Sequence, residues 1–120
     1  EAGYYELEIN ALGTLYEAFF VWQSDYVSGG FAADPSFRRD AKGVINFNGV
    51  GFKSHPRGRR IGFMRWDFPG LRSAVHVDGT LNDDSDRDNG WSVEFAFPWH
   101  SAGMHALARA DKRAVPPHDG

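Results

Sequence analysis

The chain has 120 residues, a formal net charge of −3 and no cysteine. This length fits one domain over residues 1–120, and a hydrophobic content of 42% lets such a domain bury roughly two thirds of its unfolded surface. The negative charge argues against nucleic acid or an acidic membrane as a partner, and the lack of cysteine excludes a disulfide framework and thiol chemistry. No apolar run approaches the roughly 18 residues of a membrane helix.

The first half of the chain predicts a β-hairpin, a long loop and further short strands. The strand segments are rich in β-branched and aromatic residues, and the loop is rich in Gly, Ser, Asp and Pro. The predicted elements are strands at residues 4–10, 14–21, 44–53 and 60–66, a loop at 24–44 with room for one helical turn at 36–42, and a basic turn at 55–60.

The second half predicts another hairpin and a short helix. Apolar and polar residues alternate in residues 72–81 and 90–98, on both sides of a loop rich in Asp and Asn. Residues 99–110 predict the helix. We expect the alternating residues to form one core, because they share a period-two phase with the first strand. The expected core residues are Trp91, Val93, Phe95 and Phe97 together with Tyr5, Leu7 and Ile9.

Two stretches resemble a known family. The first runs Gly79-Thr80-Leu81-Asn82 and continues with Asp86, Asp88, Gly90, Trp91, Val93, Glu94, Ala96, Pro98 and Trp99. The second is Tyr4-Tyr5-Glu6-Leu7-Glu8-Ile9-Asn10 followed by Gly13-Thr14-Leu15-Tyr16. Both are similar to the family 9 carbohydrate-binding module-like domain, and the resemblance spans roughly residues 4–117.

The resemblance and the short strands agree on the fold class. Five or six strands and one helix after the last motif strand predict an all-β fold. The resemblance implies an antiparallel β-sandwich of jelly-roll or immunoglobulin-like type. It also implies a bacterial, extracellular or periplasmic module that binds xylan- or cellulose-type glycans, tethered to the other domains of a polysaccharide-degrading protein.

The ends of the chain predict a fragment of that domain. Residues 5–9 already alternate like a sheet strand, and residues 115–120 have the composition of a loop. The resemblance implies further strands before the first residue and after the last one. It also implies that the aromatic side chains that sandwich a sugar in the family lie in those segments, so none of them is carried over to this chain.

The carbohydrate-binding candidates within the chain are Trp22, Trp66 and Glu8. An aromatic plane buries the apolar face of a sugar ring, and both tryptophans lie beside polar loops that would leave them exposed. The alternative is that each of them closes the end of a sheet. Trp91 and Trp99 are in phase with each other, which places Trp91 in the core and Trp99 in the core or against the helix.

Asp84, Asp86 and Asp88 have the alternating spacing of metal ligands. Carboxylate oxygens suit Ca²⁺, so calcium is a candidate cofactor. The loop is not an EF-hand, because Asn89 stands where glycine is required and Phe95 stands at the twelfth position. The alternative is a solvated turn in which Asp and Asn side chains bind their own backbone.

The sequence leaves two further function classes as alternatives to sugar binding. Four strand carboxylates are candidates for a small glycosidase, although acids that alternate with apolar residues are typical of a solvent face; they are Glu6, Glu8, Asp78 and Glu94. A basic group is a candidate for nucleic acid, but ordinary surface is the simpler interpretation; it comprises Arg38, Arg39, Lys42, Lys53, Arg57, Arg59 and Arg60. The sequence therefore predicts a non-catalytic carbohydrate-binding module, with a structural accessory module as the alternative.

Overall fold

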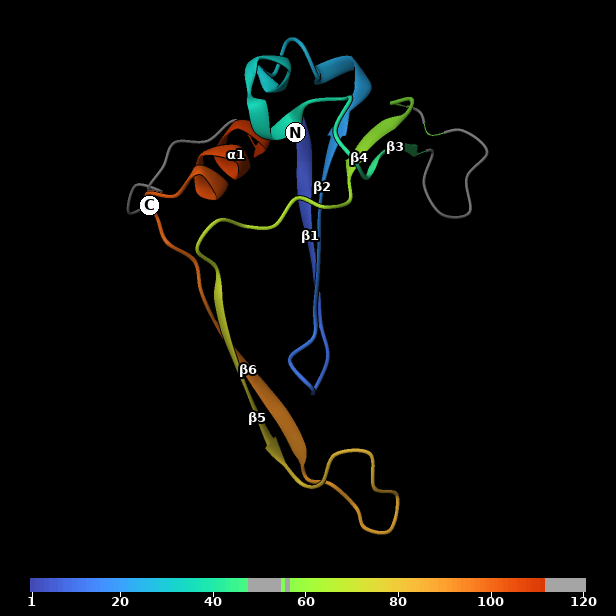
Figure 1. Cartoon of the computed structure of the whole chain (residues 1–120), viewed down its shortest axis with the longest axis vertical. Coiled ribbons are helices and arrows are strands. Elements are labelled where there is room, and N and C mark those ends of the chain that lie inside the picture. Colours follow the sequence, from blue (N-terminus) through green and yellow to red (C-terminus); the bar gives the residue numbers. More distant parts are fainter. Residues whose placement is uncertain (48–54, 56, 112–120) are drawn as a thin grey trace.

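A computed structural model of the chain describes residues 1–47, 55 and 57–111. Within these residues, six strands form two antiparallel sheets, and a short α-helix follows the last strand (Figure 1). The four-stranded sheet has the order β1-β2-β4-β3, with β1 at Gly3–Ile9, β2 at Leu15–Trp22, β3 at Val44–Phe47 and β4 at Arg60–Phe63. The second sheet is the hairpin of β5, Arg72–Asp78, and β6, Gly90–Ala96. The helix α1 spans Ala102–Asp111.

This arrangement confirms the all-β class with one short helix. The six strands fall inside the predicted segments or differ from them by a residue or so at one end. The part of the predicted strand that follows Phe47, the basic residue Lys53 and the C-terminal loop at 115–120 lie outside the described residues. No helix in the described part of the chain is both long and apolar enough to cross a membrane.

Local side-chain chemistry closes the β1–β2 hairpin. The Asn10 carboxamide oxygen accepts hydrogen bonds from the backbone N–H groups of Leu12 and Thr14, at 3.1 and 2.9 Å. Gly13 adopts a φ of 78°, which glycine reaches without steric cost. The turn sets a register in which Tyr5 faces Phe19 and Gly3 faces Val21.

The long loop after β2 contains three short 3-10 helices, namely η1 (Gln23–Asp25), η2 (Phe31–Ala33) and η3 (Pro35–Phe37). Asp34 caps η3, because its carboxylate accepts a hydrogen bond from the Ser36 N–H at 2.9 Å. The helical turn predicted for residues 36–42 therefore lies earlier, because Pro35 occupies the first position after the cap, where its fixed φ favours helix. These turns direct Phe31 and Phe37 into the core.

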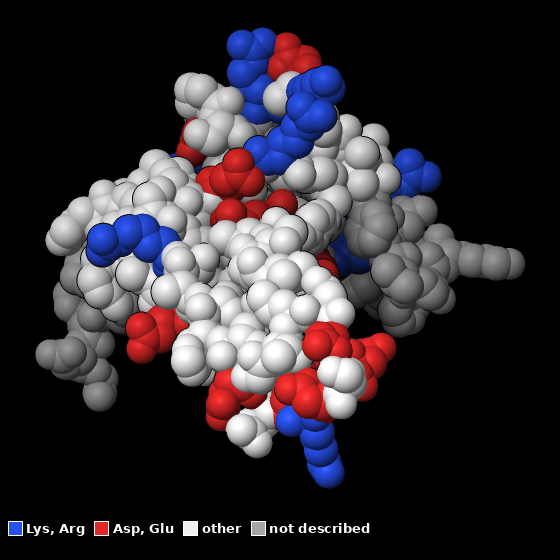
Figure 2. All heavy atoms as spheres, turned by 60° about the horizontal axis from the view of Figure 1, so that its bottom comes forward, with Lys and Arg blue, Asp and Glu red and all other residues white. Residues whose placement is uncertain are grey.

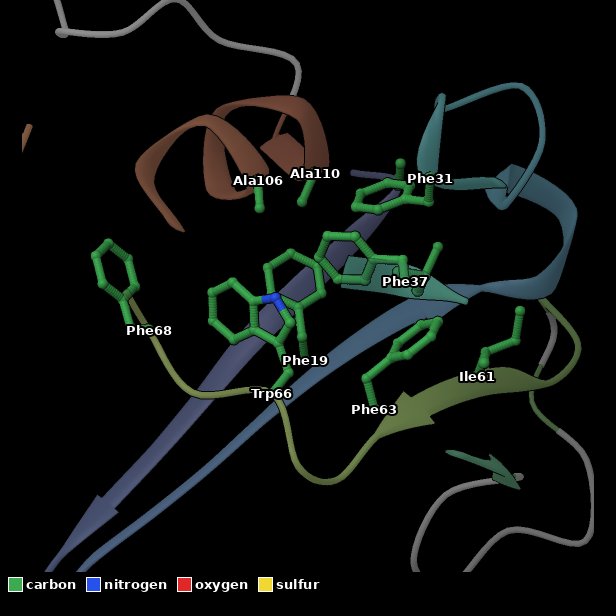
Figure 3. Packing of buried hydrophobic residues seen from close by; sticks show 11 residues of the cluster. Phe19, Phe31, Phe37, Ile61, Phe63, Trp66, Phe68, Ala106 and Ala110 are labelled. Atoms are coloured by element: carbon green, nitrogen blue, oxygen red, sulfur yellow. The ribbon is translucent and has the colours of Figure 1, made fainter. Parts of the chain in front are cut away.

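The hydrophobic core is aromatic and lies between one face of the four-stranded sheet, the 3-10 turns and α1 (Figure 3). The Phe19 ring lies 4.9 Å from the Trp66 ring and 5.0 Å from the Phe37 ring, both edge-on. Edge-to-face contacts of this kind add to the free energy of burial. Ala106 and Ala110 of α1 cover the other side of the cluster.

The predicted core is partly wrong. Tyr5 and Phe97 do pack against the core, and Phe97 lies 5.1 Å from the Phe68 ring. Val93, Phe95, Leu7 and Ile9 are only half-buried. Trp91 is 47% exposed and Trp99 is 51% exposed, so neither belongs to the core.

The direction of the β5–β6 hairpin explains this difference. The hairpin projects away from the four-stranded sheet, so only its base reaches the core (Figure 1). The Cα radius of gyration is 17.2 Å, whereas a compact domain of this length has about 14 Å. Trp91 lies near the far end of the hairpin, and Trp99 lies in the turn that precedes α1.

Candidate functional site

A hollow of about 320 Å³ opens beside Trp66, next to the ends of β3 and β4. Its floor is apolar, with contributions from Val44, Phe63 and the Trp66 indole. Its polar lining residues are Ser36, Lys42, Arg65 and Asp67. We call this the Trp66 hollow. Ligand pockets have this composition, with apolar walls and a few convergent polar groups.

Three separate segments form the Trp66 hollow. η3 contributes Ser36, the turn before β3 contributes Lys42, and the turn after β4 contributes Arg65 and Asp67. The last turn is closed by a hydrogen bond from the Trp66 N–H to the Phe63 carbonyl, at 3.2 Å. That turn carries the indole under the sheet and leaves its two flanking charged residues at the surface.

A glycine positions the arginine of the hollow. Gly43 has a φ of 85°, and a Cβ at this position would lie 2.8 Å from the Cγ atom of Arg65. The aliphatic part of the Arg65 side chain therefore packs against the Gly43 backbone, where there is no side chain. A hydrogen bond of 3.0 Å from the Met64 N–H to the Gly43 carbonyl holds the two segments together. A side chain at position 43 would therefore force the Arg65 stem to move.

Trp66 itself is mostly buried, which contradicts the expectation of an exposed ring. It is 8% exposed and contacts Phe19, Phe37, Tyr5 and Phe68. It is the only one of the three sequence-derived carbohydrate candidates among the residues that line the hollow. Most of the ring packs in the core. Only the small exposed part that lines the hollow is available for contact with a ligand.

Trp22 and Glu8 lie on the opposite face of the four-stranded sheet, which we call the outer face. Strand register places Tyr4 opposite Phe20, Glu8 opposite Tyr16 and Trp22 opposite Arg60 on this face. Trp22 is six residues along β2 from Tyr16, a distance of about 20 Å in a strand. Trp22 and Glu8 therefore do not meet around one sugar ring.

The Trp22 ring is 7% exposed and two guanidinium groups lie against it, so it is not the open platform that sugar stacking needs. The Arg57 guanidinium carbon lies 4.6 Å from the ring centre, and the Arg60 carbon lies 5.5 Å from it. The His55 ring lies 4.7 Å away and is tilted by 31°. The sequence-based alternative, in which Trp22 closes a sheet end, fits this environment.

Two tyrosines and two carboxylates lie further along the outer face, on β1 and β2. The Tyr4 and Phe20 rings stack at 5.1 Å, and an Arg60 Nη1 hydrogen donates to the Tyr4 hydroxyl. Burial raises the pKa of Tyr4, although the Arg60 charge opposes this. Partial burial, then the negative charges of Glu6 and Glu8, raise the pKa of Tyr16. Tyr4 and Tyr16 were not predicted as candidate binding residues. The period-two alternation of β1 and β2 could have identified them, because it places both on the same face as Glu8.

The four candidate catalytic carboxylates lie on two different sheets. Glu6 and Glu8 are on the outer face of β1, whereas Asp78 and Glu94 are on the β5–β6 hairpin. Glu8, Asp78 and Glu94 are exposed, and Glu6 is half-buried. Only Asp78 lines one of the hollows described in this structure. This arrangement does not favour the water-excluded carboxylate pair of a glycosidase.

The Asp-rich loop binds its own chain. Asp86 accepts a hydrogen bond from the Thr80 hydroxyl, and Asp88 accepts one from the Thr80 N–H, both at 2.8 Å. These contacts fit the alternative of a solvated turn. Acidic side chains gather at the end of the molecule where this loop lies (Figure 2). Within the described residues, no three His, Asp or Glu side chains are placed to hold a metal ion. Calcium at Asp84, Asp86 and Asp88 stays a prediction.

A second hollow, of about 260 Å³, lies on the β5–β6 hairpin. Its lining includes His76, Asp78, Asn89, Trp91 and Ser92. Its lining residues all come from the β5–β6 hairpin and its turn, whereas three packed segments line the Trp66 hollow. Sequence reasoning did not anticipate either hollow.

Comparison with known proteins adds no relative, because no family model, curated protein or solved structure matches the chain.

Proposed function

We propose that the chain is a non-catalytic carbohydrate-binding module that holds a xylan- or cellulose-type oligosaccharide at the Trp66 hollow. The observation that carries the proposal is the combination of an apolar floor with Lys42, Arg65, Asp67 and Ser36 around one hollow of about 320 Å³. A sugar ring presents apolar C–H faces and a rim of hydroxyl groups. An apolar floor suits the faces, and charged groups suit the rim.

Each polar residue of the hollow has a definite role in this proposal. The Lys42 and Arg65 side chains donate hydrogen bonds to sugar oxygens, and the Asp67 carboxylate accepts hydrogen bonds from sugar hydroxyls. The Ser36 hydroxyl can do both. The hollow is open to solvent on one side, so it desolvates one face of a ring and binds weakly compared with a closed pocket.

The resemblance to family 9 modules supplies the rest of the proposal. It suggests a module of the extracellular space or periplasm, tethered to a polysaccharide-degrading protein, in which the two sheets are layers of a jelly-roll or immunoglobulin-like sandwich. Half-buried apolar residues on both sheets support the sandwich, since each sheet has an apolar face available for packing. They include Leu7, Ile9, Val75 and Val93.

The second candidate function is a structural accessory module with the same fold and no sugar site. The burial of Trp22 and Trp66 favours it, because both tryptophans that the sequence offers for stacking serve packing instead. The two candidates differ in one respect that an experiment can measure, which is whether the Trp66 hollow takes up a sugar.

Titration calorimetry with xylo- and cello-oligosaccharides tests the proposal. We expect Asp67→Asn and Arg65→Ala to weaken binding at least about tenfold each, because each removes a charged hydrogen-bonding group worth about 1.5–3 kcal/mol. Glu94→Gln and Arg72→Ala are matched controls, since both residues are exposed and lie on the β5–β6 hairpin. Binding that survives both hollow variants would place the sugar elsewhere, and a wild-type chain that binds no oligosaccharide would favour the structural module.

A further inference from the structure

The basic side chains around Trp22 form a defined group on the outer face of the four-stranded sheet. We call it the Trp22 cluster, and it consists of Trp22, His55, Arg57 and Arg60. The Arg60 guanidinium carbon lies within 5.6 Å of three ring centres, those of Tyr4, Phe20 and Trp22. Cation–π contacts of this kind hold a guanidinium in a fixed plane. The cluster lies on the face opposite to the core, away from the core ring of Trp66.

Arg57 is the member of the cluster that faces solvent. Its side chain is 41% exposed, and its guanidinium carbon lies 4.6 Å from the Trp22 ring centre. Its backbone N–H donates to His55 Nδ1 at 3.1 Å, which fixes the turn that carries it. The two side-chain hydrogen bonds described for Arg57 both use Nη2, toward the Glu1 carbonyl and the Asp25 carboxylate. Among the described residues, Nε and Nη1 are left for a ligand.

The local charge favours an anion. Arg57, Arg59 and Arg60 occupy three of four consecutive positions, and the Asp25 carboxylate pairs with Arg57 at 3.3 Å. A guanidinium presents two parallel N–H groups that match the two oxygens of a carboxylate. Because Trp22 and the turn already hold Arg57 in place, little side-chain entropy is lost when it binds such a group.

The rest of the outer face limits how much negative charge a ligand can carry. Glu6 and Glu8 share this face with Tyr4 and Tyr16, and they would repel a second anionic group further along. The same residues can exchange hydrogen bonds with neutral hydroxyl groups. The face therefore suits a hydroxyl-rich chain with isolated acidic groups.

We propose that the Trp22 cluster binds the carboxylate of a uronic acid side group on a polysaccharide whose backbone is neutral. This site is separate from the Trp66 hollow and goes beyond it. Single-stranded nucleic acid fits less well, because its bases need an exposed ring to stack on and Trp22 is covered, and because its next phosphates would meet Glu6 and Glu8.

Titration calorimetry with the intact chain tests this inference. The probes are a xylo-oligosaccharide with one glucuronic acid group, the same oligosaccharide without it, and a single-stranded DNA oligonucleotide. We expect the acidic sugar to bind about tenfold more tightly than the neutral one, and this preference to fall as salt rises. Arg57→Gln should abolish the preference and leave neutral binding unchanged. Arg57→Lys should retain part of the preference for the acidic sugar, because lysine keeps the positive charge but lacks the two parallel N–H groups of the guanidinium.

Arg38→Gln is the matched control, because Arg38 is an exposed arginine that pairs with Asp40. Thermal melts of the three variants check that each one folds. The inference is overturned if neutral and acidic sugars bind equally, if Arg38→Gln has the same effect as Arg57→Gln, or if DNA binds more tightly than the acidic sugar. Equal binding of the two sugars would leave the proposed function intact, whereas binding of neither would overturn both proposals.

Discussion

The Tyr5 hydroxyl donates a hydrogen bond of 2.5 Å to the Glu17 carboxylate across the β1–β2 pair. The same carboxylate oxygen accepts a hydrogen bond from the Phe68 N–H at 2.8 Å, which ties the sheet to the segment that leads into β5. Burial, followed by the contact with Glu17, raises the pKa of Tyr5, so the hydroxyl keeps its proton. One carboxylate thus joins three segments on the core side of the sheet.

Glu17→Gln should lower the free energy of unfolding by about 1–3 kcal/mol, because it weakens two charge-assisted hydrogen bonds while it preserves the shape of the side chain. Urea denaturation measures this change. Glu94→Gln is the control, since an exposed substitution of the same kind should cost less than about 0.5 kcal/mol. Equal effects of the two substitutions would show that the Glu17 contacts do not stabilise the fold.

The pairing of Asp34 with Arg109 predicts an acid-sensitive component of stability. Partial burial alone would raise the pKa of Asp34, but the hydrogen bonds from Ser36 and the Arg109 guanidinium outweigh it and lower the pKa below the ordinary value of 3.8. The stabilisation is complete above the unfolded-state pKa and is lost as the pH falls through the lower folded-state pKa. Asp34→Asn should therefore reduce stability at neutral pH and flatten its decline in acid, as measured by urea denaturation across that range. An identical acid decline in the variant would contradict this assignment.

The aromatic core predicts a contrast between two phenylalanines. Phe37 is fully buried among Phe19, Phe31, Phe63 and Trp66, so Phe37→Ala should cost about 3–5 kcal/mol. Phe95 is half-buried on the projecting hairpin, so Phe95→Ala should cost clearly less. Urea denaturation of both variants decides the matter, and a larger cost at Phe95 would mean that the hairpin is packed more tightly than described.

The hydrogen bonds of Thr80 predict the behaviour of the Asp-rich turn. Thr80→Val removes the hydroxyl that donates to Asp86 and should lower the melting temperature both with calcium and with a chelator. A calcium site predicts a different result, in which saturating Ca²⁺ raises the melting temperature of the wild-type chain and Asp84→Asn abolishes the rise. The calcium-dependent shift of the wild-type chain separates the two interpretations.

Period-two alternation predicted the strands well because the signal is local to each strand. It indicated correctly that Val93 and Phe95 share a face, but it carried no information on where the hairpin would point, and so Trp91 was misplaced in the core. The core residues Phe31 and Phe37 lie in a segment of loop composition, and only the 3-10 turns direct them inward. Alternation cannot reveal such residues.

The candidate site was less predictable than the strands. The sequence predicted Trp66 as a binding residue because the polar Asp67 follows it, and both residues line the hollow. Ser36 and Lys42 are more than twenty positions away along the chain, and no local pattern links them to Trp66. Only the packing of η3, the turn before β3 and the turn after β4 brings them together.

The most direct test of carbohydrate binding at the Trp66 hollow is an NMR titration of the indole N–H groups. The chain has four tryptophans, so each assigned indole resonance reports on one environment. Addition of a xylo- or cello-oligosaccharide should shift the Trp66 resonance and leave those of Trp91 and Trp99 in place, because only Trp66 lines the proposed site. A shift confined to Trp91, or no shift at any of the four at saturating sugar, would contradict the account.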